Sequence, residues 1–374
     1  MSSRDSGPFV LIAALSGRAL VAAARRAGYQ PLVADLFADL DTREIAAASI
    51  RVAGSLTRGL ERRPLLDALD RLAKGQAIEG LAYGSGFERR PALLREFARR
   101  YTLLGNRADT VIKLTDPAGF AELCARLDVP HPEIRQSATP AGEWLEKRAG
   151  GAGGGHVRPV QPGKPPGRGR YLQRRVAGRP VSASFLADDR KSLVLGFSEQ
   201  WPDPAPGQPF RYTGAVRPAH VAPAQAAAMA GAIARLVPET GLVGLNSADF
   251  LLRDAGFDLL EINPRPGATL DIFADADGGL FDLHVQACRG RLPEHAPVFA
   301  SAAASMIVYV PRACTLPPGF AWPDWTADRQ PPGIPVEAAG PLCTVHAEAD
   351  DAAAARALVR QRAAMILQRA GVGE

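Results

Sequence analysis

The chain of 374 residues carries 44 Lys and Arg against 39 Asp and Glu, a formal net charge of +5, and 47% of its residues are hydrophobic. This length allows two or three domains with cores of their own, and the composition is that of a soluble globular protein. No stretch reaches the roughly 18 apolar residues of a membrane span, so we expect no membrane partner.

The first predicted elements alternate as in a parallel α/β sheet. The apolar run at residues 9–15 is short and lacks a basic lead segment, so it predicts a first strand rather than a signal peptide. A helical pattern and a second strand at residues 31–35 follow, and "IEGLAYGSG" supplies another strand. Its turn at Gly84–Gly86 lies where such sheets bind ligands, although plain turn chemistry explains the glycines equally well. The loop "LSGRA" lacks the dinucleotide-binding fingerprint.

The amino-acid composition changes in the middle of the chain. Asp116 before Pro117 predicts a helix start, and "DVPHP" ends that helix. The following stretch, dense in Gly, Pro and Arg, predicts two short strands joined by mobile loops in a small lobe. Residues 135–179 include ten Lys or Arg but only two acidic residues. A solvated surface and a phosphate-binding lobe both fit this excess, whereas scarce aromatic residues weaken the nucleic-acid alternative.

The second half is predicted to be largely antiparallel. Residues 179–189 and 191–200 alternate as paired strands do, and residues 223–241 form a helical pattern. The segment "LNSADFLLRDAGFDLLEINPRPG" predicts a hairpin with Gly256 at its tip. A β-rich piece and a helix close the chain. Four scattered cysteines without metal-ligand spacing predict free thiols in a cytoplasmic enzyme: Cys124, Cys288, Cys314 and Cys343.

The hairpin sets two carboxylates and an amide close together. Asp249 lies in its first strand, and Glu261 and Asn263 lie in its second. Alternate residues of a strand face the same side, so Glu261, Asn263 and Arg265 point together and Asp249 can lie opposite them. Such oxygen ligands suit Mg²⁺. Ion pairs with nearby arginines are the alternative, which we disfavour because converging acids are costly without a cation.

Upstream, Lys147 precedes five glycines within residues 150–155. Glycines let backbone N–H groups approach phosphates, although this run alone also fits a flexible linker. The order of the pieces resembles the ATP-grasp superfamily: an α/β unit, a lysine with a Gly-rich loop, Asp on one strand and Glu-x-Asn-x-Arg on the next. "ADLFADLDTRE", "YGSGFE", "LLGN" and "PLCTVHAEADD" are similar to a subgroup of biotin-carboxylase-related carboligases that is linked to one-carbon cofactor metabolism.

This resemblance implies an α/β protein with the ATP-grasp fold. It predicts an N-terminal Rossmann-like (pre-ATP-grasp) domain at residues 1–106 and a linker helix with a small α+β lid lobe at 107–186. A large central ATP-grasp lobe with the metal site would follow at 187–300, and a C-terminal β-rich segment with a helix at 301–374.

The resemblance also implies roles for individual residues. Asp249, Glu261 and Asn263 would bind two Mg²⁺ ions, for which Mn²⁺ is an alternative, and Arg265 would be the catalytic residue that faces the transferred phosphate or an oxyanion. Arg211 and Arg217 would hold a substrate carboxylate, or would serve the structure alone. Many relatives carry Glu in place of Gln173. The residues implied in ATP binding are Lys113, Lys147, Gly150, Gly151, Gly153, Gly154, Gly155, His156, Gln173 and Val176.

The implied activity is that of an ADP-forming carboxylate–amine ligase that works through an acyl phosphate. Its substrates would be small molecules, with glutamate joined to an amine of a methanofuran- or tetrahydromethanopterin-type cofactor as the first hypothesis. An ATP-dependent carboxylase that uses bicarbonate is one alternative, although a biotin-carrier segment is absent. A non-catalytic nucleotide sensor or nucleic-acid-binding protein is another alternative. It is disfavoured because the predicted metal ligands Asp249, Glu261 and Asn263 are all present. We expect no nucleic-acid partner, and a homodimer is left open.

Overall fold

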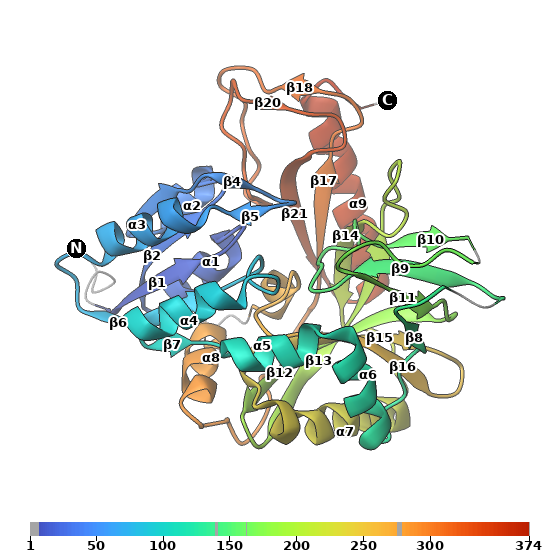
Figure 1. Cartoon of the computed structure of the whole chain (residues 1–374). Helices are drawn as coiled ribbons and strands as arrows, with labels where there is room; N and C mark the ends of the chain where they lie inside the picture. Colours follow the sequence, from blue (N-terminus) through green and yellow to red (C-terminus); the bar gives the residue numbers. More distant parts are fainter. Residues whose placement is uncertain (1–6, 139–140, 162, 275–278, 374) are drawn as a thin grey trace.

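The computed structural model describes residues 7–138, 141–161, 163–274 and 279–373, which form three connected structural units (Figure 1). An N-terminal α/β unit, a small four-stranded lobe and a large eight-stranded sheet follow one another along the chain. Within the described residues, no helix has the length and apolar character needed to cross a membrane. The four cysteines are free thiols, as predicted.

The N-terminal unit is the predicted parallel sheet, with strand order β3-β2-β1-β6-β7. Residues 10–13 of the central strand are completely buried, which explains the continuous apolar run. A hairpin, β4–β5, stands at one end of the sheet. The strands are β1 (Phe9–Ala13), β2 (Gln30–Asp35), β3 (Ala48–Arg51), β4 (Gly54–Ser55), β5 (Gly59–Leu60), β6 (Ile78–Tyr83) and β7 (Leu103–Leu104), and the helices are α1 (Arg18–Arg26), α2 (Leu40–Ile45), α3 (Arg62–Ala73) and α4 (Pro91–Arg100).

Two helices lead from this unit to the small lobe. They are α5 (Ala108–Thr115) and α6 (Pro117–Arg126), and the Asp116 carboxylate accepts a hydrogen bond from the Gly119 N–H at 3.3 Å, which confirms the predicted helix start. The lobe has four antiparallel strands where two were predicted, because two of them span only two and three residues and leave no periodic pattern. The strands are β8 (Ile134–Arg135), β9 (Trp144–Arg148), β10 (Arg158–Val160) and β11 (Arg170–Arg174).

The large sheet is antiparallel and has the strand order β16-β15-β12-β13-β14-β17-β21-β19. The predicted pairing of β12 with β13 and the predicted hairpin of β15 with β16 are confirmed. Gly256 at the hairpin tip has φ +86°, a conformation that favours glycine. The strands are β12 (Arg179–Asp188), β13 (Ser192–Pro202), β14 (Tyr212–Arg217), β15 (Val243–Leu252), β16 (Phe257–Asn263), β17 (Ala302–Tyr309), β19 (Thr326–Ala327) and β21 (Pro341–Ala349).

The C-terminal residues continue this sheet beyond residue 300, because β14 pairs with β17 and β17 pairs with β21. The closing helix α9 (Ala352–Arg369) packs on β17 and β21, and a small ribbon joins β18 (Cys314–Thr315) to β20 (Pro335–Val336) (Figure 1). Strand β12 likewise crosses residue 186 within one sheet. The three boundaries between the four domains drawn from the sequence stay predictions.

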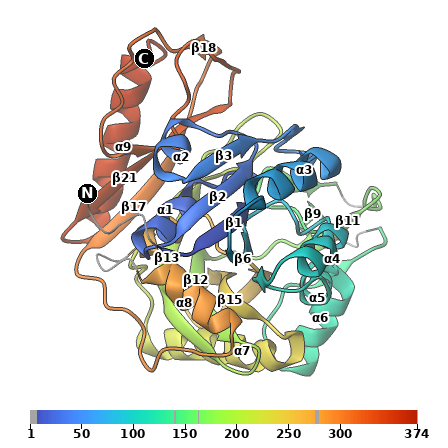
Figure 2. The same cartoon turned by 90° about the vertical axis from the view of Figure 1, so that its left-hand side faces the viewer.

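A shared core joins the N-terminal unit to the large sheet. Val21 of α1 belongs to the same buried cluster as Phe281 and Val285 of α8 (Leu280–Cys288). Figure 2 shows α8 beneath the N-terminal sheet, and α8 contacts β12 and β15 on its other side. Helix α7 (Pro223–Thr240) packs below the same strands with its own cluster, which includes Phe185 and Phe250. At the carboxyl end of the N-terminal sheet, the Tyr83 hydroxyl of β6 donates to the Pro264 carbonyl at 3.3 Å, directly after the hairpin that carries the acidic residues.

Candidate active site

The hairpin brings the predicted metal-binding residues together. Asp249 on β15 lies directly opposite Glu261 on β16. The Asn263 amide donates to the Asp249 carboxylate at 3.0 Å, and the Gln200 amide of β13 donates to the same carboxylate at 3.4 Å. Two carboxylates and an amide oxygen therefore share one face of the large sheet.

The electrostatics of this pair fit a divalent cation. Burial and the neighbouring Glu261 charge raise the pKa of Asp249 to about 6. Burial would also raise the pKa of Glu261, but the Lys147 ammonium outweighs it and the pKa of Glu261 is lowered. A Mg²⁺ ion between the two carboxylates would relieve their repulsion and would take the oxygen donors that it prefers. Among the described residues, no three His, Cys, Asp or Glu side chains lie close enough together to hold a metal ion. A third protein ligand would therefore be an amide such as that of Asn263.

Lys147 reaches this pair from the small lobe. Its side chain on β9 is buried, and its Nζ donates to a Glu261 oxygen at 3.1 Å and to the Gln173 Oε1 at 3.4 Å. Burial opposes the charge on Lys147, yet Glu261 keeps the lysine pKa above its ordinary value. The buried Nε2 of Gln173 has no hydrogen-bond partner within the described part of the chain. Gln173 on β11 therefore keeps a donor for a ligand. Val176 is half-buried in the connection after β11.

The Gly-rich loop lies closed over the site. A Cβ at Gly150 would come within 3.2 Å of the Glu88 carbonyl oxygen, and one at Gly154 would come within 1.8 Å of the Phe210 carbonyl oxygen. The Gly153 carbonyl accepts the backbone N–H of Tyr212 at 2.9 Å. The loop thus touches the N-terminal unit on one side and the segment leading into β14 on the other.

Closure leaves little space beneath the loop. The cavity bounded by Glu88, Gly150, Gly151, Glu261 and other residues has a volume of about 40 Å³. Ligand pockets usually measure roughly 300–1,000 Å³, so this cavity by itself is too small for a nucleotide.

The remaining residues of the loop pack within it. A Cβ at Gly151 would lie 2.5 Å from the His156 ring, and one at Gly155 would lie 2.9 Å from the Gln208 amide oxygen. The His156 Nδ1 is buried without a hydrogen-bond partner among the described residues, and burial lowers the pKa of this histidine. Its ring can therefore meet a ligand in the neutral form.

Arg265 is held by a residue that the sequence analysis missed. Its Nη2 donates to the Asn263 amide oxygen at 3.2 Å, and its Nε donates to a Glu88 oxygen at 2.6 Å. The other Glu88 oxygen accepts the Gly86 N–H at 2.9 Å. Glu88 follows the Gly84–Gly86 turn at the carboxyl end of β6, and an acid after such a turn is the signal that could have identified it.

Three predicted residues have other partners. The Lys113 Nζ donates to the Glu239 carbonyl at 3.2 Å on the exposed side of α5. Arg211 donates to the Asp203 carbonyl at 3.0 Å and stacks 3.7 Å from the Tyr309 ring.

Arg217 donates to the Ser301 carbonyl at 2.9 Å and stacks over Phe299. Among the contacts of the described residues, none joins Lys113, Arg211 or Arg217 to the acidic pair. Their nucleotide and substrate roles stay predictions without structural support.

Comparison with known proteins identifies the central part of the chain. Residues 120–269 match the family model described as the ATP-grasp domain, and this stretch contains Lys147, the Gly-rich loop and both strands of the acidic hairpin. The chain contains an ATP-grasp domain. The resemblance drawn from the sequence is thereby confirmed at the level of the superfamily, whereas the one-carbon subgroup remains a resemblance.

Solved structures share this architecture over nearly the whole chain. The biotin carboxylase domain of 2-oxoglutarate carboxylase from Hydrogenobacter thermophilus, in complex with MgADP, ADP and bicarbonate, is 14% identical with a TM-score of 0.71, covering 97% of this chain and 89% of that one. An L-amino acid ligase from Bacillus licheniformis is 12% identical with a TM-score of 0.70, covering 95% and 96%.

N5-carboxyaminoimidazole ribonucleotide synthetase from Thermotoga maritima is 14% identical with a TM-score of 0.64, covering 95% of this chain and 98% of that one. At these identities the likeness shows a common fold, and it confirms the predicted α/β ATP-grasp architecture. The comparison with curated proteins gave no match.

Proposed function

We propose that this protein is an ATP- and Mg²⁺-dependent carboxylate–amine ligase that works through an acyl phosphate. The observation that carries the proposal is that three sets of charged groups lie together: the Asp249–Glu261 pair, the Lys147 ammonium that contacts Glu261, and the Arg265 guanidinium that contacts Asn263 beside the pair. Bound Mg²⁺ would neutralise charge on the transferred phosphoryl group.

The residues of the chain would position ATP. The Lys147 ammonium, now 3.1 Å from Glu261, would bind a phosphate oxygen of the nucleotide. The N–H groups of the Gly-rich loop would cover the outer phosphates, because glycines allow the backbone to approach an anion closely. The free Nε2 of Gln173 would donate to the nucleotide.

Arg265 is the proposed catalytic residue. A guanidinium has five N–H donors, and Glu88, Asn263 and the Pro266 carbonyl each accept one of those of Arg265. Two N–H groups remain for a ligand, and the three occupied ones fix their direction. They would bind the phosphate oxygens while a substrate carboxylate oxygen attacks the γ-phosphorus and ADP leaves. They would then bind the oxyanion formed when the amine attacks the carbonyl carbon, before phosphate and a proton depart.

The finer part of the proposal names glutamate as the carboxylate and an amine of a one-carbon cofactor as the acceptor. It is supported by the resemblance of four sequence motifs alone. A cytoplasmic location is supported by the four free thiols. A second candidate is a carboxylase that phosphorylates bicarbonate, which the fold shared with biotin carboxylase domains supports.

Hydroxylamine trapping tests the proposal. Enzyme, Mg·ATP and an acid without amine should yield an acyl hydroxamate, with one hydroxamate for each ADP, and glutamate is the first acid to test. Arg265→Lys should weaken trapping about tenfold or more, because Lys offers a point charge in place of a fork. Arg190→Lys, at an exposed position in the β12–β13 turn, is the matched control.

Two results would contradict the ligase. ADP formation with a wide panel of amino acids but no hydroxamate would favour a kinase. ADP formation that depends on bicarbonate and on no organic acid would favour the carboxylase.

A further inference from the structure

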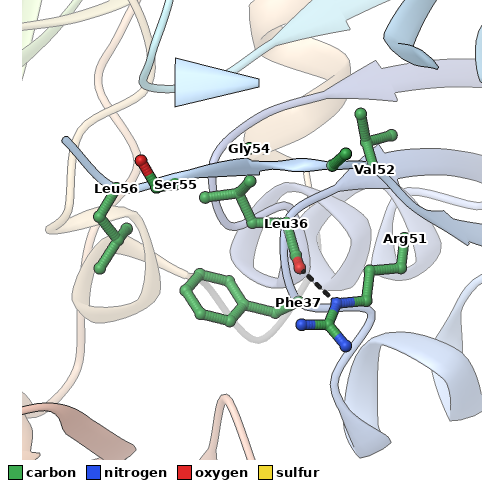
Figure 3. A pocket seen from close by; sticks show the side chains of 8 residues that line it. Leu36, Phe37, Arg51, Val52, Gly54, Ser55 and Leu56 are labelled. Atoms are coloured by element: carbon green, nitrogen blue, oxygen red, sulfur yellow. Dashed lines mark hydrogen bonds between the residues drawn. The ribbon is translucent and has the colours of Figure 1, made fainter. Parts of the chain in front are cut away.

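A second pocket lies in the N-terminal unit, away from the acidic hairpin. It has a volume of about 420 Å³ and is bounded by the loop after β2, the end of β3 and the β4–β5 hairpin (Figure 3). This volume falls within the range of small-molecule sites. The pocket also lies at the carboxyl ends of parallel strands, which is the edge where open α/β sheets bind ligands.

The wall made by the loop after β2 is fixed in place. Asp35 is fully buried, and its carboxylate accepts the backbone N–H groups of Gly17 at 2.9 Å, Phe37 at 3.2 Å and Ala38 at 2.7 Å. The acid that ends β2 is therefore occupied in holding the loop. Its position fixes the backbone at Phe37, whose ring lines the pocket.

The opposite wall depends on a glycine. Gly54 has φ +153°, and a Cβ there would come within 2.4 Å of the Gly59 carbonyl oxygen and 2.9 Å of a Leu36 methyl carbon. Only glycine lets the hairpin lie this close to Leu36. The hairpin then presents Leu56, a large apolar residue that is 55% exposed.

One cation stands at this pocket. The Arg51 Nε donates to the Leu36 carbonyl at 3.0 Å, which anchors the guanidinium beside the pocket (Figure 3). Within the described residues, its terminal nitrogens have no hydrogen-bonding or ion-pair partner, and no acidic side chain lines the pocket. The free edge of a guanidinium matches a carboxylate in a two-bond arrangement.

We infer that this pocket binds a small organic acid, with its carboxylate on Arg51 and its apolar or aromatic body against Leu36, Phe37 and Leu56. Arg51 is the one charged side chain among the described residues that line the pocket, and a single cation suits a monoanion better than a phosphate dianion. The inference does not rest on the proposed ligase, because binding here requires neither ATP nor Mg²⁺.

Fluorine NMR of 4-fluorophenylacetate, titrated with the full-length protein in the absence of nucleotide, tests this inference. We expect saturable line broadening that unlabelled phenylacetate reverses and that the neutral phenylacetamide does not. Phenyl phosphate serves as the dianionic comparison and should compete less well. Reversal by phenylacetamide as efficient as by phenylacetate would contradict the role of charge.

Variants locate the site. Arg51→Gln should weaken binding at least tenfold, and Leu56→Ser should weaken it several-fold. Arg58→Gln, an exposed arginine of the same hairpin that does not line the pocket, should bind as the wild type does. Circular dichroism and the melting temperature verify that each variant is folded.

Glu261→Gln separates this inference from the proposed function. It alters the acidic hairpin, so it should leave 4-fluorophenylacetate binding unchanged even if it stops ATP turnover. Unchanged binding by Arg51→Gln, or the absence of saturable binding by the wild type, would overturn the inference. Loss of binding in Glu261→Gln would place the acid at the hairpin and would overturn it as well.

Discussion

At the scale of single residues, Glu261 stands between Asp249 and Lys147. Replacing it with Gln removes the charge that both the proposed metal and the ammonium require, but it keeps the shape and one acceptor oxygen. We expect Glu261→Gln to lose Mg²⁺-dependent ADP formation and to keep its fold, as measured by coupled ADP release and circular dichroism. Glu143→Gln, with a side chain that is 74% exposed, is the control. Near-normal turnover in Glu261→Gln would refute the metal assignment.

Glu88 offers a second test at this scale. Its carboxylate contacts Arg265 at 2.6 Å in a buried pair, so Glu88→Gln should leave the guanidinium without a fixed direction. Misplacing a catalytic group by about 1 Å can cost about 100-fold, so we expect kcat to fall about 10- to 100-fold while KM for ATP changes little. Steady-state kinetics separate the two parameters.

The matched control for Glu88 is Glu96→Gln, which alters an ion pair with the exposed Arg62 in the same N-terminal unit. If Glu88→Gln raised KM for ATP and left kcat intact, Glu88 would act on nucleotide binding rather than on Arg265.

At the scale of elements, we propose that the Gly-rich loop acts as a lid and that its position in the structure depends on Gly154. An alanine there would place its Cβ 1.8 Å from the Phe210 carbonyl oxygen, so Gly154→Ala cannot close in the same way. We expect Mg·ATP to slow proteolytic cutting near Gly153 in the wild type, because nucleotide holds the lid shut. In Gly154→Ala this protection should be lost and KM for ATP should rise.

Gly153→Ala isolates the contact from the backbone conformation. Gly153 has φ +71° and Gly154 has φ +70°, but a Cβ at Gly153 would meet nothing within 4 Å. Both variants therefore carry the same left-handed strain of about 1–2 kcal/mol, and only one of them blocks closure. Equal loss of protection in the two variants would exclude the contact as the cause.

At the scale of the whole molecule, Arg18 connects three parts of the chain. From the start of α1 it contacts Asp271 in the 3₁₀ turn η2 (Leu270–Phe273) at 2.6 Å, and Asp328 beside β19 at 3.1 Å. Removing one partner of a buried pair typically costs 3–5 kcal/mol, so Arg18→Gln should lower the free energy of unfolding by about that amount at pH 7. Urea denaturation measures it, and Arg62→Gln, which breaks an exposed pair, should cost about 0–1 kcal/mol.

The pH dependence of this loss follows from the two carboxylates. Burial would raise the pKa of Asp271 and of Asp328, but the Arg18 charge outweighs it and lowers both. The two carboxylates therefore stabilise the folded protein fully above the ordinary carboxylate pKa of about 4. This stabilisation is lost as the pH falls through their lowered pKa values in the folded state. The difference between wild type and Arg18→Gln should shrink below about pH 4. A difference that stays constant down to pH 3 would show that the charges do not cause it.

The sequence by itself determined the features that depend on local chemistry. Side chains alternate along a strand whatever its surroundings, so the facing of Asp249 and Glu261 followed from the hairpin pattern. Asp116 begins its helix for an equally local reason, because the carboxylate accepts an N–H three residues ahead. The roles of the Gly-rich loop and of Lys147 in ATP binding were implied by a resemblance to the ATP-grasp superfamily. Residues 120–269 match the model of the ATP-grasp domain.

Only the tertiary structure decided which charged groups meet. Glu88 and Arg265 are 177 residues apart, and nothing near either residue in the sequence indicates that they pair. Arg211 and Arg217 looked available for a substrate, yet the folded chain turns both guanidiniums onto backbone carbonyls and aromatic rings. The chain has 44 basic and 39 acidic side chains, so a charge alone does not specify its partner. The partner is fixed by how the N-terminal unit, the small lobe and the large sheet pack, which is a long-range property of the fold.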